Sequence, residues 1–114
     1  MRSWIAPSVL LGGLLTGCGP QTAEQAAIAN IQHAAAAEAE ALQSAAQNQT
    51  AGIEAEADTL SQQAELANGF EAERLRTRAE ALRKEAKIVE RHGKAQVQAV
   101  RDRARADVSA LKAQ

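Results

Sequence analysis

The chain has 114 residues and a formal net charge of −1, and alanine alone supplies 28 of its residues. Aromatic residues make up 2% of the chain, as Trp4 and Phe70. Because a compact core needs large side chains and aromatics bury the most area each, this composition argues against an ordinary globular enzyme domain with a deep pocket. Both prolines lie within the first 20 residues, and a long proline-free chain rich in Ala, Glu, Gln and Arg is typical of a long helix or coiled coil.

Residues 1–17 are predicted to be a cleaved signal peptide. Arg2 gives the chain a positively charged start, and an apolar stretch follows at residues 5–15. At about 11 residues this stretch is too short for a membrane-spanning helix, which needs about 20. Its length and its place near the amino terminus are those of the apolar region of a secretory signal peptide.

A lipid attachment site is predicted directly after the apolar stretch. Leu15-Thr16-Gly17-Cys18 resembles the lipobox of bacterial lipoproteins, which is Leu, a small residue, Gly or Ala, and then Cys. In that family the peptide is cut before the cysteine, here between Gly17 and Cys18. The sulfur carries a diacylglyceryl group, and the new amino terminus is usually acylated with a fatty acid such as palmitate. Cys18 is the only cysteine, so no intrachain disulfide can form.

The resemblance also implies a location. Two or more acyl chains anchor a protein stably, so the mature chain would stay on a membrane and face the periplasm. In the sorting rule of enteric bacteria, Asp after the lipidated cysteine favours retention in the inner membrane. Here that residue is Gly19, which favours the outer membrane over the inner membrane.

Residues 18–21 are predicted to be a lipidated tether, and residues 22–113 an elongated helical region. Thr22 is a good N-cap, and Gln25 three residues later completes a capping box. Glu24 lies in the first turn, where the helix dipole favours negative charge.

An 11-residue spacing of apolar residues runs through this region. The column consists of Ile31, Leu42, Ile53, Ala64, Leu75, Ala86, Val97 and Val108. An 11-residue repeat gives a nearly straight or slightly right-handed stripe, and the distal half also fits short heptad runs. We expect an interaction stripe formed by Ile31, Leu42, Ile53, Leu75, Leu82, Val89, Val97, Val100, Val108 and Leu111.

Two all-α architectures fit this region. The favoured one is a single long helix or coiled coil, because the 11-residue phase continues unbroken past Asn68-Gly69 and a glycine inside a helix costs only about 1 kcal/mol. The alternative is an antiparallel helical hairpin that turns at Asn68-Gly69, where Asn followed by Gly resembles a helix C-cap.

Charge is unevenly distributed along the mature chain. Residues 19–70 carry seven acidic residues and no Lys or Arg, whereas residues 71–114 carry seven acidic and twelve basic residues, so the two parts have net charges of −7 and +5. Opposite charges would favour pairing of the two parts within one chain or between copies. We expect a helical protein partner or self-association, with an anionic envelope component as a further candidate and no nucleic acid, because no aromatic residue is available to stack on bases in the basic part.

No enzymatic site is expected. His33 and His92 have no His, Asp or Glu three or four residues away, so a metal site on one helix is unsupported. No phosphate-binding loop and no nucleophile motif follows Cys18, and no cofactor is expected.

The composition of the distal half is similar to that of peripheral stalk subunits of rotary ATP synthases and of late-embryogenesis-abundant repeat proteins. The nearest functional analogy is the major outer-membrane lipoprotein type, which ends in a Lys linked to the cell wall, whereas this chain ends Leu111-Lys112-Ala113-Gln114. The sequence therefore predicts a non-enzymatic, lipid-anchored envelope protein that acts as a helical spacer, tether or assembly factor. The alternative is a small accessory lipoprotein subunit of an envelope machine, such as a secretion or conjugation apparatus.

Overall fold

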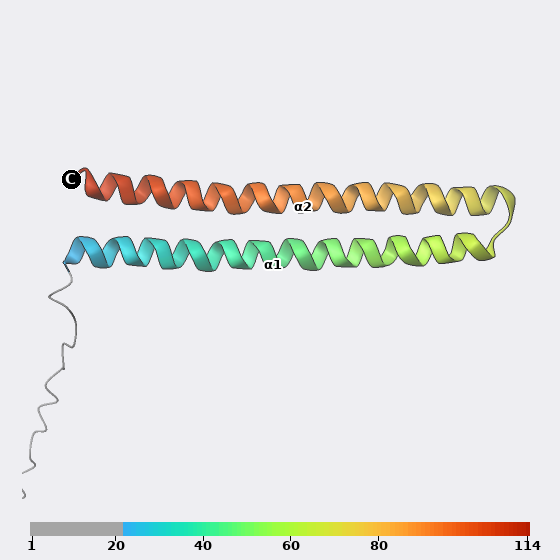
Figure 1. Cartoon of the computed structure of the whole chain (residues 1–114), viewed down its shortest axis with the longest axis horizontal. Coiled ribbons are helices and arrows are strands. Elements are labelled where there is room, and N and C mark those ends of the chain that lie inside the picture. Colours follow the sequence, from blue (N-terminus) through green and yellow to red (C-terminus); the bar gives the residue numbers. More distant parts are fainter. Residues whose placement is uncertain (1–21) are drawn as a thin grey trace, which may run out of the picture.

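Two antiparallel helices of equal length make up the described part of the protein. The computed structural model describes residues 22–114, in which α1 spans Ala23–Leu66 and α2 spans Gly69–Lys112, with 44 residues each. The helices lie side by side along their whole length (Figure 1). The all-α class expected from the sequence is confirmed, and the arrangement is the hairpin that turns at Asn68-Gly69, not one continuous helix. The predicted signal peptide and tether lie in residues 1–21, outside the described residues.

Three residues at the turn explain why the helix does not continue. Ala67 and Asn68 both have extended backbones, with ψ angles of 164° and 150°, and Gly69 has a positive φ of 59°. Extended residues cannot form the helical hydrogen-bond ladder, and the left-handed conformation of Gly69 would cost an L-residue with a side chain about 1–2 kcal/mol. Two extended residues followed by a left-handed glycine therefore reverse the chain, whereas glycine alone inside a helix would not.

The start of α1 is fixed by the capping box expected from the sequence. The Gln25 N–H donates to Thr22 Oγ1 at 3.1 Å, and the Thr22 N–H donates to Gln25 Oε1 at 3.0 Å. Both orphan N–H groups are thereby satisfied at the helix end that follows the predicted tether.

One contact fixes the register of the two helices. A Cβ built on Gly93 would lie 2.5 Å from the Cβ of Ala46, so these residues face each other at close range. Antiparallel helices keep this register one residue for one residue, which places Leu42 opposite Val97 and Ala39 opposite Val100. These four residues, with Ala35, indeed form the core cluster that includes the buried residues Ala39, Val97 and Val100.

The same register pairs every residue on the inward faces. The inward positions on the α1 side, all buried or half-buried, are Ile28, Ile31, Ala35, Ala39, Leu42, Ala46, Thr50, Ile53, Ala57, Leu60 and Ala64, followed by Ala67 just after the helix end. Their partners on α2, in reverse order along the chain, are Leu111, Val108, Ala104, Val100, Val97, Gly93, Val89, Ala86, Leu82, Ala79, Leu75 and Ala72. The core therefore consists of one row of facing residue pairs along the hairpin, each pair forming one layer. The most deeply buried residues in it are alanines.

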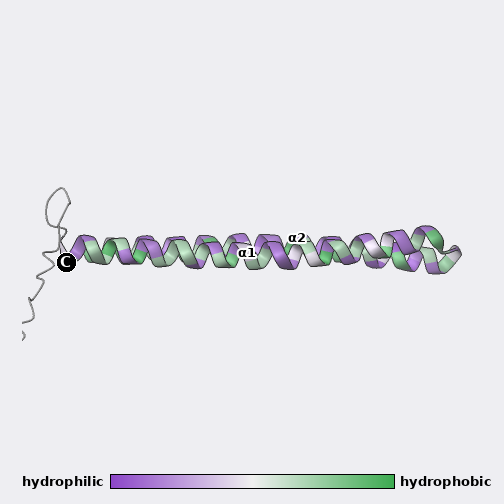
Figure 2. Ribbon diagram, turned by 90° about the horizontal axis from the view of Figure 1, so that it is seen from below, coloured by the Kyte–Doolittle hydropathy of each residue, from purple (hydrophilic) through white to green (hydrophobic). Residues whose placement is uncertain are grey.

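The hairpin is one layer thick. Seen from a direction 90° away from that of Figure 1, the two helices overlap, and hydrophilic and hydrophobic residues alternate along both of them (Figure 2). Both broad faces of the hairpin are therefore open, and any further binding surface among the described residues lies on these faces, on the outer edges or at the two ends.

Candidate interaction surfaces

The expected interaction stripe lies between the two helices. All ten of its residues occupy inward positions and are buried or half-buried. The 11-residue column pairs with itself across the hairpin, as Ile31 with Val108, Leu42 with Val97, Ile53 with Ala86, and Ala64 with Leu75. The apolar stripe therefore packs within the hairpin of a single chain. Any surface that binds a separate partner must lie outside this stripe.

Residues next to the inward positions form two broad faces. One residue is a 100° turn of the helix, so the positions directly before and directly after an inward position lie on opposite faces of the hairpin. The ion pairs confirm this geometry. Arg103 Nη2 contacts Glu38 Oε2 at 2.8 Å, and both residues directly precede an inward position. Arg83 Nη2 contacts Asp58 Oδ1 at 3.3 Å, and both directly follow one.

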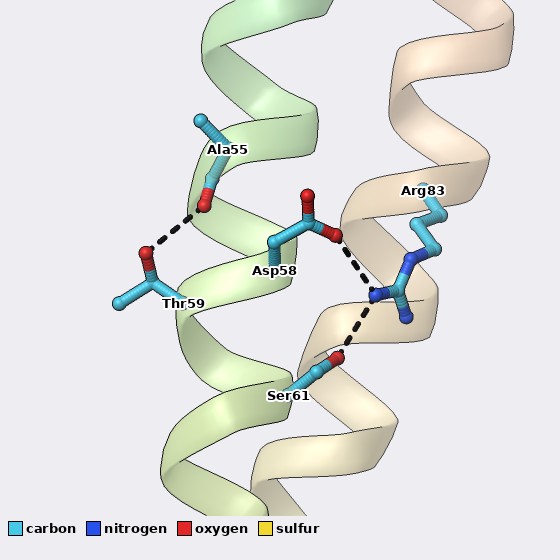
Figure 3. Close-up of polar contacts among 5 residues, drawn as sticks. All are labelled: Ala55, Asp58, Thr59, Ser61 and Arg83. Atoms are coloured by element: carbon cyan, nitrogen blue, oxygen red, sulfur yellow. Dashed lines mark hydrogen bonds and ion pairs between the residues drawn. The ribbon is translucent and has the colours of Figure 1, made fainter.

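Arg83 also joins the helices through a neutral partner. Its Nη2 donates to Ser61 Oγ at 2.9 Å, so one guanidinium nitrogen bridges Asp58 and Ser61 of α1 (Figure 3). In the same view the Thr59 hydroxyl donates to the Ala55 carbonyl at 3.0 Å and so stays within α1. The side chains of the Arg83–Asp58 pair are 45% and 70% exposed, so water and salt screen it, and such pairs contribute at most about 1 kcal/mol.

The face of positions that follow the inward ones is named the charged face here. Its α1 side carries an acidic row of Glu40, Glu54, Asp58 and Glu65. Its α2 side carries a basic row of Arg76, Arg83, Lys87, Lys94, Arg101, Arg105 and Lys112, interrupted by Glu80 and Glu90. The Glu90 Oε1 accepts from Lys94 Nζ at 2.9 Å, and this hydrogen bond and charge lower the pKa of Glu90. The acidic first part and the basic second part of the sequence therefore lie side by side on the charged face.

Two shallow grooves run along the charged face. The first, with a volume of about 520 Å³, lies beside the Ala46–Gly93 layer, and the second, of about 730 Å³, lies beside Ala35 and Ala104. Both are open to solvent and lined by alanine, glutamine and charged side chains. Within the described residues no group of His, Cys, Asp and Glu could hold a metal ion, and both His33 and His92 are exposed.

The opposite face is named the alanine face, and its middle has no charge. A neutral window of eight positions is bordered on one side by the Glu38–Arg103 pair and on the other by Glu56 of α1 and Glu85 of α2. The window consists of Ala41, Ala45, Gln49 and Gly52 on α1, and of Ile88, His92, Gln96 and Ala99 on α2. An apolar centre bordered by charged residues is the usual anatomy of a protein interface.

Three large apolar side chains are exposed in the described part, and none of them belongs to the expected stripe. Ile88, in the neutral window, is 63% exposed. Leu66 and Phe70, which flank the turn, are 89% and 81% exposed. The sequence signal for this group is that each stands next to an inward position or to the turn, and that signal becomes readable only once the hairpin register is known.

The lipidation and cleavage residues expected from the sequence, Gly17 and Cys18, lie outside the described residues. Neither α1 nor α2 combines the length and the hydrophobicity needed to cross a membrane. Comparisons with protein-family models, with curated proteins and with solved structures give no match to this chain.

Proposed function

We propose that this chain is a non-enzymatic, lipid-anchored protein of the cell envelope that acts as a helical spacer, tether or assembly factor. The observation that carries the proposal is the position of the two hairpin ends relative to the lipobox. Thr22, which caps α1, comes four residues after Cys18, so a lipid on Cys18 would hold the open end of the hairpin at the membrane. At 1.5 Å per residue, the 44 residues of α1 place the turn about 66 Å away from that end.

The exposed turn supports a role in contact at this distance. Leu66 and Phe70 are the most exposed large apolar residues of the described part, and both lie at the end remote from the proposed anchor. This observation also favours the second candidate function, an accessory lipoprotein subunit that docks its turn on an envelope machine such as a secretion or conjugation apparatus. The basic row of the charged face is the surface that would meet an anionic envelope component. An outer-membrane location facing the periplasm follows from Gly19 after the cysteine, as part of the same proposal.

The anchor is tested by Cys18→Ser in cells fed a clickable fatty-acid analogue. We expect labelling to be lost and the chain to remain unprocessed or to leave the membrane fraction, because the serine hydroxyl is not the thiol that accepts the lipid. Thr16→Ala is the matched control, since it keeps a small residue in the lipobox and should keep the label. Unchanged labelling and unchanged membrane fractionation of Cys18→Ser would overturn the lipoprotein assignment.

A further inference from the structure

We propose that the neutral window of the alanine face binds a second copy of this chain, so that two hairpins lie parallel and form a four-helix bundle. The pairing goes beyond the proposed spacer function and does not depend on a lipid at Cys18. It follows from two features of the window that the single hairpin leaves unexplained, and from the charges of the two helices.

The first unexplained feature is a glycine inside a helix. A Cβ built on Gly52 meets nothing within 4 Å, whereas one built on Gly93 strikes Ala46. Glycine in a helix interior costs about 1 kcal/mol relative to alanine. Gly93 permits the close approach of α1 and α2, but within one hairpin Gly52 has no such role.

The second feature is an exposed isoleucine at the same level of the hairpin. Ile88 is 63% exposed and shares the alanine face with Gly52, because Ile88 directly precedes the inward Val89 and Gly52 directly precedes the inward Ile53. The register set by Ala46 and Gly93 places Ile88 level with position 51, one residue from Gly52. If α2 of a second copy lies over α1 of the first, its Ile88 faces the gap that Gly52 leaves. A twofold axis makes this contact twice, since the Ile88 of each copy then packs on the Gly52 of the other.

The charges select the orientation of the two copies. A twofold axis can bring one face of the hairpin onto the same face of a second copy in two ways. With the axis across the helices, α1 lies on α1 and α2 on α2, which brings helices of like net charge together, although most of these charges lie on the charged face and not in the contact. With the axis along the helices, each α1 lies on the α2 of the other copy, so helices of opposite net charge lie side by side. In the contact itself, Glu38 of each copy then lies near the level of Arg103 of the other, and Glu56 near that of Glu85. Opposite charges attract and like charges repel at this range, so the second arrangement is favoured.

The favoured arrangement is consistent with the rest of the surface. It places both turns at one end, where Leu66 of each copy lies at the level of Phe70 and Arg74 of the other and can cover exposed apolar surface. It also places both amino-terminal ends of α1 at the opposite end, so that two lipidated copies could share one membrane. The charged face stays in water, which avoids the cost of desolvating its acidic and basic rows.

The test uses the fragment 19–114, which keeps every contact described for the hairpin and contains no cysteine. We expect analytical ultracentrifugation to show a monomer–dimer equilibrium at micromolar concentrations. Gly52→Leu should weaken the dimer at least tenfold because the added side chain fills the place of Ile88. The same substitution should raise the melting temperature of the monomer, because the site is open and leucine is a far better helix former. Ile88→Gln should also weaken the dimer, whereas Gln47→Leu, which lines a groove of the charged face, should not.

Single cysteines then report the orientation. In the parallel bundle, position 41 of one copy lies at the level of position 99 of the other, so oxidation of mixed Ala41→Cys and Ala99→Cys fragments should give a heterodimer, and neither alone should form a disulfide dimer. In the opposite orientation, Ala45→Cys alone should crosslink, because Ala45 lies near the middle of α1. A monomer at every concentration, a dimer that Gly52→Leu leaves unchanged, or crosslinking through Ala45→Cys would each overturn the proposal. All three results leave the lipid anchor untouched, since Cys18 is absent from the fragment.

Discussion

The two halves of the hairpin differ in the sizes of the side chains that face each other between the helices. In the turn half, residues 50–89, four successive layers each combine one large apolar residue with one alanine. These layers are Ile53 with Ala86, Ala57 with Leu82, Leu60 with Ala79, and Ala64 with Leu75. In the open half, residues 22–49 and 90–114, large residues mostly meet large ones and small residues meet small ones, and Ala39 with Val100 is the exception. Examples are Leu42 with Val97, Ile31 with Val108, Ala46 with Gly93, and Ala35 with Ala104.

This difference decides where the hairpin has space. When each layer holds the same total volume, the helices stay at one distance, and the alanines of the turn half are buried completely, as Ala57 and Ala79 are at 0% exposure. When small layers alternate with large ones, the small layers have fewer side-chain atoms to fill the space at the hairpin surface beside them. The two grooves accordingly lie beside Ala46–Gly93 and Ala35–Ala104.

The same substitution in the two halves should therefore have opposite effects. Ala79→Leu would place two leucines in the layer of Leu60 and should lower the free energy of unfolding by about 2 kcal/mol through overpacking. Ala104→Leu would extend into the groove beside Ala35, and burial of its added carbons should leave stability unchanged or raise it by up to about 1 kcal/mol. Urea unfolding of the two variants at equal protein concentration measures the difference. Equal losses in both would show that the halves are packed alike.

How much of this fold the sequence predicts can be judged at particular residues. The helix start at Thr22 and the apolar stripe are predictable because capping and spacing are local properties. The 11-residue phase continues unbroken past Gly69, and from the sequence alone this favours the long helix over the hairpin. The phase is unbroken in the hairpin as well, because the turn lies midway between Ala64 and Leu75, so the column pairs with itself.

The surfaces that could bind a partner are harder to predict from the sequence than the core, and the reason is physical. The stripe from Ile31 to Leu111 contains the most apolar residues, so from the sequence it is the natural contact surface for a partner. Within the hairpin the other helix of the same chain covers it. Gly52 and Ile88 become neighbours only through the register that Ala46 and Gly93 set, and that register is a tertiary property absent from any local pattern.

Substitutions at two glycines, Gly52 in the turn half and Gly93 in the open half, should change stability by smaller amounts. Gly93→Ala should lower the free energy of unfolding by about 1 kcal/mol, because the new methyl group strikes Ala46 and the overlap outweighs the gain in helix propensity. Gly52→Ala should raise it by about 1 kcal/mol, because only the gain in propensity remains. Thermal unfolding at concentrations where the fragment 19–114 is monomeric measures both. Adding Ala46→Gly to Gly93→Ala should restore the approach of the helices and recover the lost stability, and failure to do so would show that the Gly93 contact is not what limits the register.

The ion pairs between the helices, of which one is taken from each half, should contribute least to the free energy of unfolding. Arg83 pairs with Asp58 in the turn half at 3.3 Å, and Arg103 pairs with Glu38 in the open half at 2.8 Å. All four side chains are between 45% and 70% exposed, so Arg83→Gln and Arg103→Gln should each lower the free energy of unfolding by no more than about 0.5 kcal/mol. Arg83 also holds Ser61, and glutamine can still donate a neutral hydrogen bond there, so the loss in the turn half should depend less on salt than the loss at Arg103. Urea unfolding at low salt and at about 1 M salt, where the screening length falls to about 3 Å, separates the two contributions. A loss at Arg103 that persists at high salt would mean that its aliphatic stem, and not its charge, stabilises the open half.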